Sequence, residues 1–289
     1  MSSSSPQSVA VSALSHPSGV NLDGVASGFS AYLRKKWWAF LLILVLTIGL
    51  AFINPIMGLA VLIIGTFFMK QLYENVLFQA FANTNHFSFA RSGQIEASGL
   101  IFDIGNSRRF SDIVTGQYLQ WPLLLFIYTY TIGYGRDSHT YNRAVMAIKF
   151  SVSLPAFVLR RHKFLGNLTD EGESLKKYSY SQKVNLEGDF NKHFEVYIRP
   201  NTQDNVLAIL TPDVMNMLIG LDKYEVELTD SGTLYVYSHD LITKKQDLVD
   251  IYSIVEAIIP KLSRHANMQK ELNTLATANQ STATPVTPA

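Results

Sequence analysis

The longest apolar stretch of the chain runs from Trp37 to Met69, 33 consecutive residues without a charged side chain. As one helix, rising about 1.5 Å per residue, it would be about 50 Å long, more than a bilayer core of about 30 Å. Asn54 and Pro55 interrupt it with an N-cap residue followed by the residue preferred in the first helical position. The pattern therefore predicts two membrane-spanning helices, at about Tyr32–Phe52 and Pro55–Tyr73, joined by a tight turn.

The alternative is a very hydrophobic helical hairpin buried inside a soluble protein. The run Leu41–Leu46 is apolar on every face, which suits lipid better than a one-sided core, and Trp37 and Trp38 are typical of a membrane interface. The positive-inside rule then predicts a multi-pass cell-membrane protein with both termini in the cytoplasm. Four basic residues flank the predicted spans and set this orientation: Arg34, Lys35, Lys36 and Lys70.

From Phe87 onward the apolar positions recur with a period of two, which is typical of strands. Tyr128, Tyr130 and Ile132 alternate with smaller residues, and Pro122 indicates that their strand begins after it or lies at an edge. The polar stretch from Asn106 to Gly116 predicts a loop or a short helix. The predicted strands are Phe87–Arg91, Leu100–Ile104, the run within Gln117–Tyr134, a return strand over Ala144–Val152, Pro155–Arg160 and Phe194–Arg199.

The C-terminal third predicts two helices and a hairpin. Thr211-Pro212-Asp213 is a helix start, with a cap, a proline and an acidic residue near the positive end of the dipole. Tyr224–Leu228 and Thr233–Tyr237 predict a β-hairpin, and Lys244–Ser263 predicts an amphipathic helix. The stripe on that helix is Leu248, Ile251, Tyr252, Val255, Ile258, Ile259 and Leu262.

These elements predict an α+β soluble domain with mainly antiparallel strands, tethered to an N-terminal two-helix transmembrane hairpin. Residues 1–30 are expected to form a disordered tail, and residues 31–75 are expected to form the transmembrane hairpin. A cytoplasmic domain is expected over 76–265, followed by a disordered tail over 266–289 that is rich in Thr, Ala and Pro.

Composition narrows the function classes. The chain has no cysteine, which excludes disulfides and Cys-based metal sites. Its net charge of +1 gives no global basic field, so nucleic acid is not an expected partner. No cofactor-binding motif is found, because Gly133-Tyr134-Gly135 lacks the other residues of a phosphate loop. We therefore expect neither a cofactor nor a metal ion.

The candidate chemical groups each have a simpler structural explanation. Seven histidines are scattered without the spacing of a metal site. Asp189 with His193 is the best candidate pair for acid–base chemistry, but such residues are also ordinary at the start of a strand. Asp170, Glu171 and Glu173 form an acidic cluster without the spaced oxygen ligands of a calcium loop, as in a solvated loop.

The densest basic run is Arg160-Arg161-His162-Lys163. Arg160, Arg161 and Lys163 could contact anionic lipid headgroups, at about 1 kcal/mol for each basic residue near the surface. The alternative is the solvated end of a strand. With the basic residues that flank the apolar run, these three complete the predicted set of membrane-surface contacts.

Four segments of the domain resemble an uncharacterised bacterial family with N-terminal membrane spans and a soluble domain of unknown function. The segments are Leu186–Phe190, Phe194–Tyr197, Ile209–Met215 and Leu234–Tyr237, which follow an "EGDF…F.vY…iLTPdvM…lyvYS" succession. The resemblance covers roughly Tyr128 to Ser238. It implies the topology of a membrane-anchored domain and supplies no activity.

Two functions of different classes fit these observations. The first is a non-enzymatic interaction or scaffold module, membrane-anchored, with the lipid bilayer and a protein partner or a second copy of the chain as partners. The second is a membrane-bound enzyme or a small-ligand or lipid sensor, whose site is assembled from distant loops. A deep pocket ringed by His193, Asp189 or His162, with converging polar groups, would favour the second function. A shallow surface with an apolar patch would favour the first.

Overall fold

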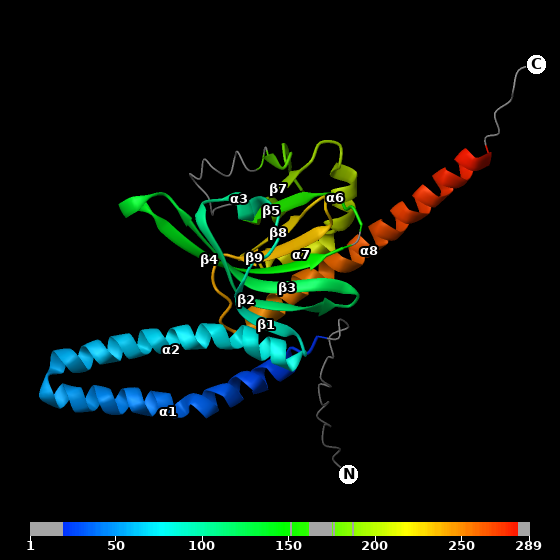
Figure 1. Cartoon of the computed structure of the whole chain (residues 1–289). Helices are drawn as coiled ribbons and strands as arrows, with labels where there is room; N and C mark the ends of the chain where they lie inside the picture. The colour runs from blue at the N-terminus through cyan, green and yellow to red at the C-terminus, as the bar shows by residue number, and fades with distance from the viewer. Residues whose placement is uncertain (1–19, 151, 162–174, 176, 187, 283–289) are drawn as a thin grey trace, which may run out of the picture.

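A computed structural model of the chain describes residues 20–150, 152–161, 175, 177–186 and 188–282. Its centre is a sheet of nine strands in the order β1-β2-β3-β4-β9-β8-β5-β7-β6, and every neighbouring pair is antiparallel (Figure 1). The predicted α+β architecture with antiparallel strands is confirmed. The strands are β1 Ser88–Gly93, β2 Asn106–Tyr118, β3 Trp121–Ile132, β4 His139–Lys149, β5 Phe157–Arg161, β6 Gln182–Val184, β7 Phe194–Ile198, β8 Tyr224–Leu228 and β9 Thr233–Ser238.

Helices cover the first face of the sheet, where the larger core lies. Alternate residues of β8, namely Tyr224, Val226 and Leu228, point into this core, as the period of two requires. The predicted apolar stripe of the last helix is confirmed, because all seven of its residues are buried there. The helices are α1 Asp23–Ile53, α2 Pro55–Thr84, α3 Leu100–Asp103, α5 Phe190–His193, α6 Gln203–Ile209, α7 Pro212–Ile219 and α8 Lys245–Thr282, with a 3-10 turn η1 Gly135–Asp137.

The helices α1 and α2 form the predicted helical hairpin. The Asn54 side chain accepts a hydrogen bond from the Ile56 amide at 2.9 Å, and Pro55 follows it in the first turn, so the predicted cap is confirmed. The open end of the hairpin belongs to the domain core, where Val25, Phe78 and Phe81 are buried. The hairpin is therefore an extension of the fold (Figure 1).

The predicted membrane spans require a correction. Among the residues that the structure describes, no helix has both the length and the apolar character needed for a bilayer crossing. Asn54 divides the charge-free run into 17 residues, 37–53, and 15 residues, 55–69. Both parts are shorter than the roughly 20 apolar residues that one helical crossing needs. This finding overturns the transmembrane tether, and with it the multi-pass location with both termini in the cytoplasm.

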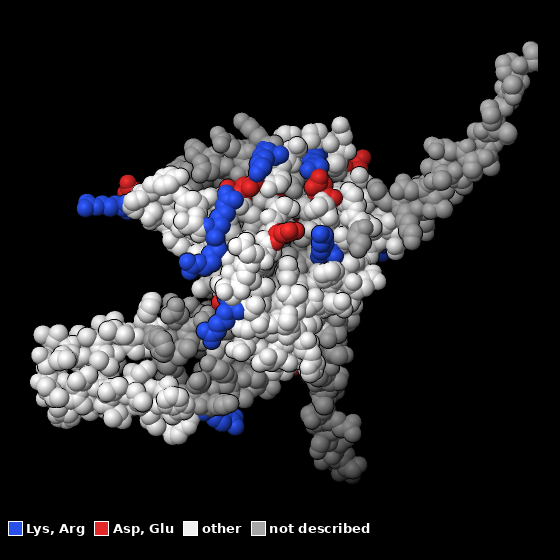
Figure 2. Space-filling view, in the orientation of Figure 1, with Lys and Arg blue, Asp and Glu red and all other residues white. Residues whose placement is uncertain are grey.

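The far part of the hairpin exposes large apolar side chains. Leu44, Phe52 and Ile63 have exposed fractions of 51%, 88% and 59%. Figure 2 shows this part of the surface without acidic or basic side chains over the residues it describes. Contiguous apolar surface of this kind is unusual on a protein and marks an interaction surface.

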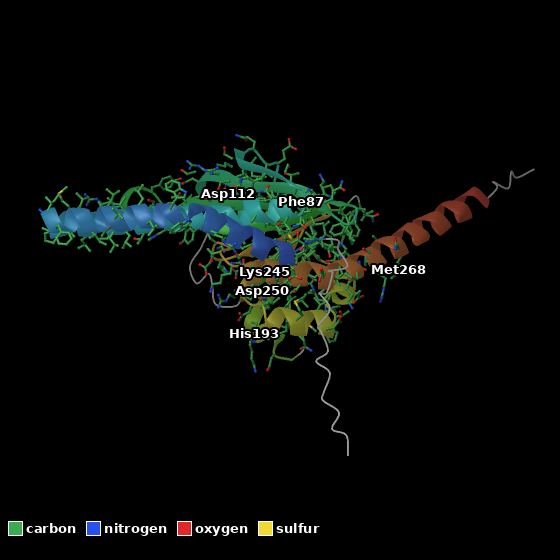
Figure 3. The ribbon with its side chains drawn as sticks, turned by 90° about the horizontal axis from the view of Figure 1, so that it is seen from below. Phe87, Asp112, His193, Lys245, Asp250 and Met268 are labelled. Carbon is green, nitrogen blue, oxygen red and sulfur yellow. The ribbon has the colours of Figure 1, made fainter. Side chains whose placement is uncertain are left out.

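Three other predictions differ from the structure. Leu100–Ile104 was predicted as a strand, but its apolar residues form the short buried helix α3. Asn106–Gly116 was predicted as a loop or short helix, but it lies in β2, whose pairing with β3 is irregular at two places. The helix α8 continues to Thr282 instead of ending near Ser263, and Figure 3 shows Met268 on the part that extends away from the sheet.

Candidate functional site

A short extended segment, residues 94–99, leads from β1 to α3 across the second face of the sheet (Figure 1). We call this segment the strap. Ile95 and Ala97 are half-buried and pack against the aromatic cluster on that face, whereas Gln94, Glu96 and Ser98 are exposed. Because successive side chains of an extended chain point in opposite directions, the strap presents an apolar edge to the sheet.

A cavity of about 440 Å³ lies between the strap and the ends of β3, β4 and β9. Its volume is within the range of about 300 to 1,000 Å³ that is usual for ligand pockets. The apolar and aromatic residues that line it are Ile95, Ala97, Pro122, Leu124, Phe126, Ala147 and Tyr235, and the polar ones are Glu96, Ser98, Lys149, Ser231 and Thr233. A small molecule with an apolar body and a polar end matches this lining.

Two charged side chains of opposite sign line the cavity. Lys149 ends β4 and pairs across the sheet with Thr233 of β9. Glu96 lies on the strap, and both charged residues are exposed. Within the described part of the chain neither makes an ion pair, so the Lys149 ammonium group is available to an anionic ligand.

Tyr235 combines apolar surface with a hydroxyl group in the cavity lining. Burial raises the pKa of its hydroxyl to about 12, and the nearby Glu227 adds to the rise, while hydrogen bonds with the Ser98 backbone and Thr233 oppose it. The phenol therefore stays neutral at physiological pH. It joins the strap to β9 through Ser98, and it supplies a hydrogen-bonding group to the cavity wall.

Glu227 lies directly across from Tyr235 in the β8–β9 pair and is fully buried, with 0% of its surface exposed. Both of its carboxyl oxygens accept from the Leu100 amide, at 2.8 and 2.9 Å. Burial raises the pKa of Glu227 to about 8, although the Leu100 amide and the Tyr180 hydroxyl partly oppose the rise. The carboxyl group therefore connects the sheet to the junction between the strap and α3.

A second buried polar network lies further along the same face. Arg143 donates from Nε to the Tyr130 hydroxyl at 3.0 Å, and its Nη1 lies 2.6 Å from His239 Nδ1. Because arginine has only donors, His239 Nδ1 must accept, which places the imidazole proton on Nε2. That nitrogen faces Glu225 Oε1 at 3.4 Å. The network thus joins β3, β4 and β8 to the residue that follows β9.

The cations around this network keep Glu225 in its charged form. Burial alone would raise the pKa of Glu225, but the hydrogen bond with His239 and the charges of Arg143 and Arg160 hold this pKa below its ordinary value. His239 also lines a cavity of about 250 Å³ between β8, β9 and the start of α8. Since Arg143 occupies its Nδ1 atom, the imidazole is an internal connector and not a base that is open to a ligand.

The described members of the predicted membrane-surface set lie on two elements, α1 and β5. Arg34 is exposed on α1. Arg160 is buried on β5, with 8% exposed, and the backbone amide of Arg161 donates to Glu225 Oε1 at 3.2 Å. Arg160 is therefore neither at a solvated strand end nor at the surface. The side chains of Lys35, Lys36 and Lys70, and the whole of Lys163, lie outside what the structure describes, so the predicted contact stays a prediction.

The structure also separates the candidate acid–base pair. Asp189 forms an ion pair with Lys192 at 2.6 Å, whereas His193 Nδ1 lies 3.1 Å from Asp222 Oδ2. Each side chain thus has a different partner. The acidic cluster Asp170, Glu171 and Glu173 lies outside the described residues, and the described residues contain no group of three potential metal ligands.

Sequence reasoning missed the strap, Glu227 and the cavity. In Tyr224–Leu228 the acidic residues alternate with apolar ones, a pattern that indicates a strand with one solvated face. Both acidic residues, Glu225 and Glu227, are buried instead. The junction of the strap with α3 covers Glu227, whereas His239 lies against Glu225. The available signal was the pair Ser98-Gly99 before an apolar triplet, which is too common to predict a crossing segment.

The comparisons with known proteins add little to this geometry. No family model and no curated protein matches the chain, so its resemblance to the uncharacterised bacterial family stays a prediction. Among solved structures, the crystal structure of the mycobacterial trehalose monomycolate transport factor A, TtfA, matches with a TM-score of 0.46 and 10% identity. The match covers 65% of this chain and 94% of that chain. So distant a likeness carries no inference about function.

Proposed function

We propose that this chain is a non-enzymatic binding protein that takes a small amphipathic molecule in the cavity under the strap. The observation that supports the proposal is the cavity itself, with about 440 Å³ of space between the strap and three strands of the sheet. Its walls are mainly apolar and a few polar groups converge on it, the arrangement that is usual for small-molecule sites. His193 and Asp189, which were expected around such a pocket, do not line this cavity. The support for a ligand-binding protein over a scaffold therefore comes from the cavity's own lining.

The polar groups define the end of the ligand that they would contact. Lys149 supplies a positive charge, and the Thr233 and Ser231 side chains supply hydroxyl groups nearby in the lining. The apolar part of the ligand would lie against Leu124, Phe126 and the strap. An aromatic or short aliphatic carboxylate has these properties, and naphthoate is a suitable probe.

Binding of 2-naphthoate, followed by its fluorescence, tests the proposal. Ala97→Phe places a ring in the cavity from the strap, and we expect it to weaken binding at least tenfold. Ala90→Phe is the matched control, because Ala90 is exposed on β1 and does not line the cavity. If the two variants bind naphthoate as the wild type does, the probe binds elsewhere and the proposal is wrong.

A second comparison tests the role of the charge. Lys149→Gln removes the cation, and we expect it to weaken naphthoate binding by about fivefold or less, as for an exposed ion pair. Binding of the neutral 2-naphthamide should not change in this variant. Equal losses for both probes would show that Lys149 acts through packing and does not select an anion.

A second function, self-association of the chain, is favoured by the exposed apolar side chains of the α1–α2 hairpin. Apolar surface of this extent marks a site of interaction. This function is compatible with a ligand cavity, because the hairpin side chains that are exposed do not line it. The enzyme hypothesis has less support, since its best candidate pair, Asp189 and His193, is not assembled.

A further inference from the structure

The strap is attached to the sheet mainly at its C-terminal end. There the Leu100 amide donates to Glu227, and Tyr235 makes a hydrogen bond with the Ser98 backbone. Gly99 lies so close to the Glu227 carboxyl group that an added Cβ would be 3.0 Å from Oε2. In the middle of the strap, the Ala97 amide donates only to the nearby Ile95 carbonyl, at 3.1 Å. One buried carboxyl group thus anchors the segment that forms a cavity wall.

The groups around Glu227 give its negative charge little support. The Leu100 amide donates to it, and the Tyr180 hydroxyl, which donates to the Leu228 carbonyl at 3.3 Å, lies beside it. Asp103 of α3 and Glu225 of the same strand are acidic and oppose its ionisation. Three phenols of the described residues also interact with it, and they supply no positive charge: Tyr178 beside α3, and Tyr235 and Tyr237 on β9. A buried carboxylate with few donors is costly, and exposure to water would relieve that cost.

We propose that the strap is a pH-responsive wall of the cavity, closed when Glu227 is protonated and loosened when Glu227 is ionised. Separation of the strap from the sheet would admit water to the carboxylate, so the loosened state favours the charged form. The closed state favours the neutral form, which is the cheaper one in a buried site. Protonation and strap closure are therefore linked, and the link does not depend on which molecule occupies the cavity.

The direction of the effect follows from the two protonation equilibria. Glu227 in the closed state has a pKa of about 8, above the ordinary value of 4.5 that an exposed carboxyl group would have. The closed state therefore binds the proton more tightly, and raising the pH between these values shifts the equilibrium toward the loosened state. A single linked proton changes the equilibrium constant between the closed and loosened states by at most tenfold for each pH unit.

Hydrogen exchange of backbone amides tests the proposal on the full chain. We expect the Leu100 and Ala97 amides to lose at least tenfold in protection between pH 6 and pH 8.5, after correction for the intrinsic rate. The amide of Tyr128, in the middle of the sheet, is the internal control and should keep its protection. The variant Glu227→Gln keeps the side-chain shape without the titrating proton. In this variant the protection of the Leu100 and Ala97 amides should not fall between pH 6 and pH 8.5.

Two results would overturn the proposal. In one, the protection of the Leu100 and Ala97 amides changes with pH no more than that of the Tyr128 amide. The wild type alone provides this comparison, so it holds even if the variant does not fold. The other is a loss at Leu100 while Ala97 follows the control, because then only one hydrogen bond responds and the strap does not move. Neither result depends on naphthoate binding, so the proposed function is tested separately.

Discussion

Burial governs the chemistry of Glu227, a side chain with 0% of its surface exposed. The folded protein holds its proton more tightly than the unfolded chain, because its pKa is about 8 in the fold against an ordinary value of 4.5. Its contribution to stability is therefore complete below about pH 4.5 and is lost as the pH rises toward 8. The same residue thus connects the strap to the sheet and makes the fold sensitive to pH.

The variant Glu227→Gln should remove this part of the pH dependence. We expect the wild-type free energy of unfolding to fall between pH 5 and pH 8, and the variant to fall by clearly less over the same range. Denaturant unfolding at several pH values measures both slopes. Parallel slopes for the two proteins would contradict the assignment of the raised pKa to Glu227.

Arg143 is the central donor of the second buried network, between Tyr130 and His239. Arg143→Met would leave those groups buried without their donor and would remove one of the two arginines that stabilise the Glu225 carboxylate. We expect it to destabilise the protein by about 3 kcal/mol, as for the removal of one partner from a buried charge network. Lys149→Met, an exposed change on the same strand, should cost less than about 0.5 kcal/mol. Similar losses in chemical denaturation would be evidence against the network.

At the scale of the element, local signals predicted the segments whose own residues decide their structure. Asn54-Pro55 predicted the turn of the helical hairpin. The apolar patterns of Tyr224–Leu228 and Thr233–Tyr237 predicted the β8–β9 hairpin, in whose turn Gly232 has a φ of +76°. The predictions for Leu100–Ile104 and Asn106–Gly116 were wrong, because contacts with distant strands determine the structure of these two segments. The second of these segments pairs with both β1 and β3, and its Ser107 and Asp112 have left-handed backbone conformations, which the alternation of polar and apolar residues does not indicate.

The two ends of the α1–α2 hairpin are joined by one side chain. Asn85 accepts from the Asn21 amide at 2.6 Å and donates to the Asn21 and Phe81 carbonyls at 3.2 and 3.0 Å. We expect Asn85→Ala to cost about 1 to 2 kcal/mol of stability, the usual net value of a few hydrogen bonds. Asn83→Ala, an exposed position in the same helix, is the matched control. Equal midpoints of thermal unfolding for the two variants would contradict a closing role for Asn85.

At the scale of the whole molecule, the domain has two surfaces that suit binding, the cavity under the strap and the apolar part of the α1–α2 hairpin. The sequence indicated the second through its long charge-free run, although the membrane crossing predicted from it is not supported. The sequence did not indicate the cavity, because residues of β3, β4, β9 and the strap form it together. Long-range assembly of this kind leaves no local pattern.

The hairpin surface makes a prediction about the full chain in solution. Leu44 and Ile63 are exposed on α1 and α2, and glutamate at both positions would place charges within the apolar surface. We expect Leu44→Glu with Ile63→Glu to reduce the self-association of the chain in sedimentation velocity experiments. The exposed domain change Lys149→Gln is the control. An unchanged distribution of sedimentation coefficients would exclude this surface as the site of self-association.

The central claim is that a small amphipathic molecule binds under the strap, and intermolecular NOEs from bound 2-naphthoate test it most directly. The account predicts NOEs from the naphthalene protons to the methyl groups of Ala97, Leu124 and Ala147, which lie on the strap, β3 and β4. These contacts should disappear in Ala97→Phe and persist in Ala90→Phe. NOEs confined to hairpin methyl groups such as those of Leu44 and Ile63, or none at all, would contradict the claim.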